Sequence, residues 1–129
     1  MKNYLRLTAL LGALAVAVGA FGAHGLKTLV GPEDLVTFNT GVRYHFYHVL
    51  AMGLAVVLLR VPGVRTVWLR RALLAWAVGI LLFSGSLYLL TLRAQIGIPA
   101  SVLGPITPVG GLFFIAGWGF LFFAPGSDD

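Results

Sequence analysis

The side chains best suited to chemistry are concentrated in residues 43–48, which read Arg-Tyr-His-Phe-Tyr-His. In a helix, Arg43 and Tyr47 share one face and Tyr44 and His48 share the neighbouring face, because the members of each pair are four residues apart. Guanidinium, phenol and imidazole groups hydrogen-bond well to polar or anionic ligands. This segment is therefore the first candidate for a binding site.

Three imidazoles would be available to a metal ion, from His24, His45 and His48. Metal sites commonly add a thiolate or a carboxylate, but the chain has no cysteine and its acidic residues lie outside the apolar stretches. A haem held between His24 and His48 is a chemical alternative, although both imidazoles are expected close to the membrane surface. We expect no metal site and no cofactor.

Four long apolar stretches must position these groups, and they predict an all-α membrane protein. Each stretch approaches the ~20 residues that a helix needs to cross ~30 Å of hydrocarbon. We expect one domain, a compact bundle of four transmembrane helices covering residues 1–129. The predicted spans are residues 4–26, 44–61, 68–92 and 105–123.

Composition excludes several other classes of protein. Hydrophobic residues make up 59% of the chain and charged residues 10%, with a mean hydropathy of +0.95, which excludes a water-soluble fold. The net charge is +5, but the basic residues flank the apolar stretches instead of forming a stripe with interleaved aromatics. We therefore expect the lipid bilayer, and no nucleic acid, as a partner.

The first apolar stretch resembles a signal peptide but is better interpreted as a transmembrane span. It is longer than a typical signal core, and its small residues are spaced to form a seam for close helix packing. The second helix is expected to begin before its membrane-spanning part, at the helix-start signal Gly31-Pro32-Glu33-Asp34. This start adds an amphipathic extension to the second helix. The predicted seam consists of Gly12, Ala15, Gly19 and Ala23.

The distribution of basic residues predicts the orientation of the bundle. Six lysines and arginines are expected on the side that holds both termini, and three on the other side. The positive-inside rule then places both termini in the cytoplasm. The six are Lys2, Arg6, Arg60, Arg65, Arg70 and Arg71, and the three are Lys27, Arg43 and Arg93.

All four helices are expected to bring polar groups to the outer half of the membrane. Ionisable groups at membrane depth usually face a bundle interior or a cavity, which favours a ligand-binding pocket. A structural account is also open, in which Arg43 extends to the headgroups and the other groups lie at the interface or bond between helices. The candidate cluster comprises His24, Arg43, Tyr44, His48, Ser84, Ser86, Tyr88 and Thr107.

Four ordered motifs, which together cover nearly the whole chain, resemble the small YgdD-like membrane family. This resemblance implies four spans in a bacterial inner membrane and no established catalytic activity. The family pattern usually has glutamine where this chain has His45, which weakens a metal site that needs this imidazole. The motifs are Gly19-Ala-Phe-Gly-Ala-His-Gly25, Arg43-Tyr-His-Phe-Tyr-His48, Phe83-Ser-Gly-Ser-Leu-Tyr88 and Ile106-Thr-Pro-Val-Gly-Gly111, followed by Gly117-Trp118.

Three classes of function remain open after the sequence has been read. The first is an interaction or structural component that packs against itself or a larger membrane complex. The second is a binder of a lipid headgroup or a small lipophilic ligand such as a quinone. The third is a transporter acting as a dimer, in which histidine would replace the intramembrane carboxylate of common carriers. An enzyme is not expected, because the spacings assemble no catalytic set.

Overall fold

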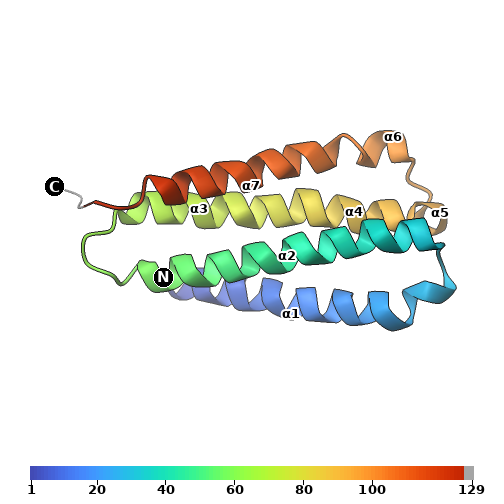
Figure 1. Cartoon of the computed structure of the whole chain (residues 1–129), viewed down its shortest axis with the longest axis horizontal. Coiled ribbons are helices and arrows are strands. Elements are labelled where there is room, and N and C mark those ends of the chain that lie inside the picture. The colour runs from blue at the N-terminus through green and yellow to red at the C-terminus, as the bar shows by residue number, and fades with distance from the viewer. Residues whose placement is uncertain (127–129) are drawn as a thin grey trace.

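The computed structural model describes residues 1–126, which form four long helical rods lying side by side (Figure 1). The start of α1 and the end of α7 lie at one end of the rods, and α5 and α6 lie at the other end. We call these the terminal end and the loop end. In order, the helices are α1 (Lys2–His24), η1 (Leu26–Thr28), α2 (Pro32–Leu58), α3 (Thr66–Gly79), η2 (Ile80–Ser84), α4 (Gly85–Thr91), α5 (Arg93–Ile96), α6 (Ala100–Leu103) and α7 (Ile106–Phe122).

Four helices are long and apolar enough to cross a membrane, which confirms the predicted all-α class and the four-helix architecture. The third rod runs through α3, η2 and α4 without a break, and η2 is a π-helix. The second helix starts at Pro32, as the helix-start signal predicts, with Glu33 and Asp34 in its first turn. The four candidate spans are Lys2–His24, Pro32–Leu58, Thr66–Thr91 and Ala100–Phe122.

Helix α1 packs against α2 along a seam of small residues. A methyl group added to Gly22 would overlap the ring of Phe38, so the two helices approach closely at this point. Phe38 is almost completely buried, and the first third of α2 therefore packs along α1. Ala23, the predicted last member of the seam, faces outward. The observed seam consists of Gly12, Ala15, Gly19 and Gly22.

Helix α7 approaches the third rod closely enough for backbone to meet backbone. A methyl group on Gly110 would collide with the backbone of Phe83 inside η2. Nearer the terminal end, Gly117 leaves room for the indole of Trp76, which is completely buried. Two glycines of α7 thus set its distance from α3 and η2, the most extensive helix contact in the bundle.

Polar contacts tie the connections at both ends. At the loop end, Arg93 forms a salt bridge of 2.9 Å with Asp34, joining the start of α5 to the start of α2. At the terminal end, an Nη2 atom of Arg65 donates to the carbonyls of Phe123 and Pro125, at 2.6 and 3.1 Å. These contacts hold the segment after α7 against the α2–α3 connection.

Candidate functional site

Arg43 faces outward from α2 and does not point into the bundle. Its nearest polar partner is the Thr40 hydroxyl, at 3.4 Å from Nη2. Thr40 lies one turn closer to the loop end, so the guanidinium extends towards that surface, as the structural account predicts.

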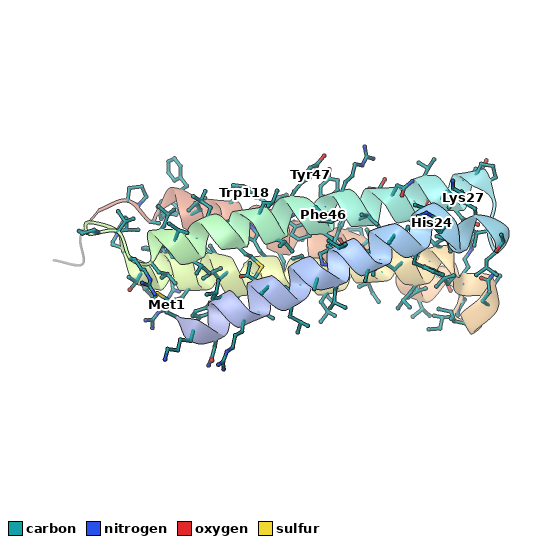
Figure 2. The ribbon with its side chains drawn as sticks, turned by 90° about the horizontal axis from the view of Figure 1, so that it is seen from below. Met1, His24, Lys27, Phe46, Tyr47 and Trp118 are labelled. Atoms are coloured by element: carbon teal, nitrogen blue, oxygen red, sulfur yellow. The ribbon has the colours of Figure 1, made fainter. Side chains whose placement is uncertain are left out.

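His24 lies at the loop end and does not join the other candidate residues. Its Nδ1 bonds to the Ala20 carbonyl of its own helix at 2.9 Å, and the imidazole is exposed. Figure 2 shows His24 beside Lys27, far along the bundle from Met1. The structure therefore does not bring His24 together with His45 and His48.

His45, which the candidate cluster left out, joins three helices. It is the middle residue of α2 and is 3% exposed. Its Nε2 lies 2.9 Å from the Leu11 carbonyl of α1, and its Nδ1 lies 2.9 Å from the Tyr88 hydroxyl of α4. A carbonyl only accepts, so Nε2 carries a proton; in the neutral imidazole Nδ1 then accepts from the Tyr88 hydroxyl.

His48 makes the corresponding contact on the other side of α2. Its Nδ1 donates to the Tyr44 carbonyl at 2.7 Å, and its Nε2 accepts from the Trp118 indole at 3.1 Å. The imidazole stacks on Phe114 with a centroid separation of 3.6 Å. Both nitrogens are used inside the protein, and the two bonds fix a neutral imidazole with the proton on Nδ1.

The serine and threonine candidates bond between helices. Ser84, which is fully buried, donates to the Gly41 carbonyl of α2 at 2.7 Å. Ser86 and Thr107 share a hydrogen bond of 2.6 Å between α4 and α7. These contacts are the interhelical polar bonds that membrane bundles use when no water is available to polar groups.

The histidine bonds lie deeper than the sequence predicted. Counting the second span from Tyr44 placed His48 beside the outer surface, whereas the packing of residues from Pro32 along α1 puts His45 at mid-length of α2. His48 is one turn closer to the terminal end. The difference arises because close contacts such as Gly22 with Phe38 depend on which helices are neighbours, and one sequence does not show that.

Tyr44 contributes its ring to a groove between α2 and α7. The ring packs against Phe83 at 4.8 Å between centroids, and Tyr47 lies on the outward side. Figure 2 shows Tyr47 and Trp118 on the same side of the bundle, with Tyr47 projecting away from it. The α2–α7 groove has a volume of about 520 Å³. Its lining residues are Tyr44, Tyr47, His48, Phe83, Gly111, Phe114, Ile115 and Trp118.

The arrangement connects the helices through hydrogen bonds between side chains and to backbone carbonyls. Over residues 1–126 there is no group of three histidine, aspartate or glutamate side chains placed to hold a metal ion. The buried imidazoles and hydroxyls are bonded to backbone carbonyls or to one another. Fold and site together define a four-helix membrane protein with an internal polar cluster and a lateral aromatic groove.

The sequence model of the family described as "Protein of unknown function (DUF423)" matches residues 18–111, and the chain belongs to this family. The chain is 45% identical to the UPF0382 membrane protein YwdK of Bacillus subtilis, with 92% of this chain and 91% of the relative covered. It is 40% identical to the UPF0382 inner membrane protein YgdD of Escherichia coli, covering 88% and 82%. No solved structure matches the chain.

Proposed function

We propose that this protein is a non-catalytic interaction component of the bacterial inner membrane. In this proposal the internal polar bonds fix the bundle, and the α2–α7 groove receives a transmembrane helix of a partner chain. The observation that carries the proposal is that His48, in the floor of the groove, already uses both ring nitrogens within the bundle. The groove is consequently suited to packing more than to chemistry.

The lining of the α2–α7 groove supports helix docking. Helices associate in membranes through van der Waals contact at small residues, and Gly111 in the groove wall offers such a position. A methyl group on Gly111 would approach only the ring of Phe83, at 3.8 Å. Ile115 and Tyr47 stand at the rim with exposed fractions of 68% and 55%. Aromatic and aliphatic anchors of this kind commonly dominate interface energies.

Photocrosslinking in native membranes tests this proposal. A photoreactive residue at Tyr47 or Ile115 is expected to capture a protein, and the adduct mass separates a second copy of this chain from a different protein. A probe at Leu81, which is 72% exposed and lies outside the groove, serves as the control for Ile115. Gly111→Leu should fill the groove and abolish the adduct. Adducts with lipid alone at both groove positions would refute the proposal.

A second candidate is a binder of a lipid headgroup or small lipophilic ligand. Arg43 favours it, because an outward guanidinium beside the Tyr44 wall would meet an anionic group at the loop end of the groove. Native mass spectrometry of gently extracted protein should then show a retained mass that Arg43→Gln removes. The proposal does not include transport. Common carriers place a carboxylate inside the membrane, whereas Glu33 and Asp34 both lie in the first turn of α2.

We further propose that both termini face the cytoplasm. The terminal end carries six of the nine basic residues, and the positive-inside rule assigns that end to the cytoplasm. Reporter domains fused to the C-terminus test this orientation. A reporter that is active only in the cytoplasm should function there, and one that is active only in the periplasm should not. The reverse pattern would overturn the assignment.

A further inference from the structure

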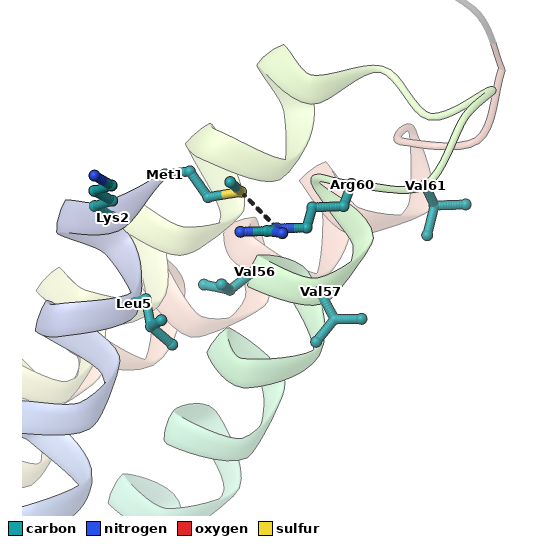
Figure 3. Close-up of a pocket in the computed structure, with 7 residues that line it drawn as sticks. All are labelled: Met1, Lys2, Leu5, Val56, Val57, Arg60 and Val61. Carbon is teal, nitrogen blue, oxygen red and sulfur yellow. Dashed lines mark hydrogen bonds between the residues drawn. The ribbon is translucent and has the colours of Figure 1, made fainter.

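A second groove lies at the terminal end, between the first turns of α1 and the last turns of α2 (Figure 3). Its volume is about 410 Å³, and its walls are almost entirely apolar. Figure 3 shows the Met1 and Arg60 side chains meeting across it. We call it the α1–α2 groove, and its lining residues are Met1, Lys2, Leu5, Val56, Val57, Arg60 and Val61.

Two cationic side chains, Lys2 and Arg60, line this apolar groove, and both are exposed. Among residues 1–126 the structure has one salt bridge, and it lies at the loop end of the bundle. The carboxylates of this range, Glu33 and Asp34, both belong to the first turn of α2, about 40 Å along the helix from Arg60. Neither cation is therefore neutralised by a carboxylate within the described part of the chain.

The guanidinium of Arg60 contacts the start of α1. Its Nε donates to Sδ of Met1 at 3.3 Å, which joins the end of α2 to the start of α1. Because Nε is used in this way, both terminal nitrogens remain available to an external acceptor. A guanidinium presented through its two terminal nitrogens fits the paired oxygens of a phosphate.

We propose that the α1–α2 groove binds an anionic phospholipid of the leaflet at the terminal end. The phosphate lies on Arg60 and Lys2, and an acyl chain runs along Leu5 and Val57. These two apolar side chains are 57% and 64% exposed, so in the membrane they lie against hydrocarbon. The cations lie beside them at the ends of α1 and α2, where headgroups are found.

Charge complementarity selects an anionic lipid over a zwitterionic one. Lys2 and Arg60 together carry two positive charges, whereas a single phosphate brings one negative charge. Phosphatidylethanolamine adds an ammonium group that the cations repel, but phosphatidylglycerol has an uncharged glycerol in its place. Basic pockets between transmembrane helices are a recognised kind of site for anionic headgroups.

Native mass spectrometry of the full chain in detergent, titrated with phosphatidylglycerol or phosphatidylethanolamine, tests the proposal. Phosphatidylglycerol should bind saturably and more tightly than phosphatidylethanolamine. Arg60→Gln and Lys2→Gln should each weaken phosphatidylglycerol binding about fivefold, and the double variant about 25-fold. Val57→Trp should also weaken binding, because it fills the acyl part of the groove without changing the charge.

Arg70→Gln is the matched control, because Arg70 is an exposed arginine at the same end but outside the groove. It should leave the dissociation constant unchanged. Equal losses for Arg70→Gln and Arg60→Gln would overturn the proposal in favour of a general basic surface. Three other outcomes would also overturn the proposal. They are equal affinity for the two lipids, no effect of Val57→Trp on binding, and a bound protein in place of a bound lipid. Helicity and melting temperature of each variant show that it remains folded.

Discussion

Two neutral imidazoles act as connectors between helices at the centre of this protein. His45 bonds α2 to α1 and α4, and His48 bonds α2 to α7. In each ring one nitrogen donates to a backbone carbonyl, and in the neutral imidazole the other accepts, from the Tyr88 phenol in His45 and from the Trp118 indole in His48. A contact between helices of this kind requires one side chain that carries a donor and an acceptor at a fixed spacing. In the function we propose, both histidines act as structural groups.

Replacing His45 tests this interpretation. His45→Ala removes two interhelical bonds and should lower the free energy of unfolding by about 1 to 2 kcal/mol. His45→Gln should retain most of the stability, because the amide nitrogen donates to the Leu11 carbonyl while its oxygen accepts from Tyr88. Unfolding in mixed micelles, followed by circular dichroism, measures both variants. His24→Ala is the control and should change little, since that imidazole bonds only within α1.

A double-mutant cycle isolates the bond between His45 and Tyr88. Tyr88→Phe alone should destabilise the protein, but should cost less in the background of His45→Ala, where the partner is already lost. The expected coupling is about 0.6 kcal/mol, typical of interhelical hydrogen bonds in membranes. Additive effects of the two changes would show that the 2.9 Å contact contributes nothing measurable.

At the residue scale the sequence identified the right chemical groups but not their partners. Ser84, Ser86, Tyr88 and Thr107 were predicted to lie at membrane depth, and all four bond between helices or within them. The candidate cluster does not include His45, although its imidazole offers a donor and an acceptor to two neighbouring helices. Which partner each group finds depends on helix neighbours, and spacing alone does not provide them.

At the element scale, glycines decide how closely the helices approach. Gly110→Ala should lower the free energy of unfolding by about 1 to 3 kcal/mol, because the new methyl group meets the backbone of Phe83. A side-chain rotation cannot remove a clash with backbone atoms. Gly119→Ala is the matched control in the same helix, since nothing lies within 4 Å of the added methyl group. The same micelle unfolding assay measures both. Equal destabilisation by the two changes would mean that loss of glycine itself matters, not the contact.

The elements were predictable to the extent that hydropathy and helix-start signals define them. The four helices and the start at Pro32 follow from length, composition and the acidic first turn. The π-helix at Ile80–Ser84 could not be predicted, because a widened turn does not change the apolar pattern of the sequence. It brings Ser84 to the Gly41 carbonyl and Phe83 to Gly110, so a packing demand from two neighbours accounts for it.

At the scale of the whole molecule, the charged groups are unequally divided between the two ends. The terminal end has six basic residues. The other half of the bundle pairs Arg93 with Asp34 and otherwise holds Lys27 and Arg43, which lies two residues before the middle of α2. An asymmetry of this kind commonly sets the orientation of membrane proteins, through the membrane potential and the anionic surface of the cytoplasmic leaflet. The orientation we propose should therefore respond to basic residues whose removal leaves the packing intact.

Moving charge between the ends tests the orientation directly. Neutralising Arg60, Arg70 and Arg71 to glutamine leaves three basic residues at the terminal end, and Ser101→Lys raises the loop end from three to four. The bias is then reversed, and C-terminal reporters should detect a population with the termini outside. Arg65 is kept, because it holds the segment after α7 through the Phe123 carbonyl. Ser101→Lys alone leaves six basic residues at the terminal end against four at the loop end, and it should not change the topology. A response to that single change would show that hydropathy or folding order sets the orientation, and not the charge balance.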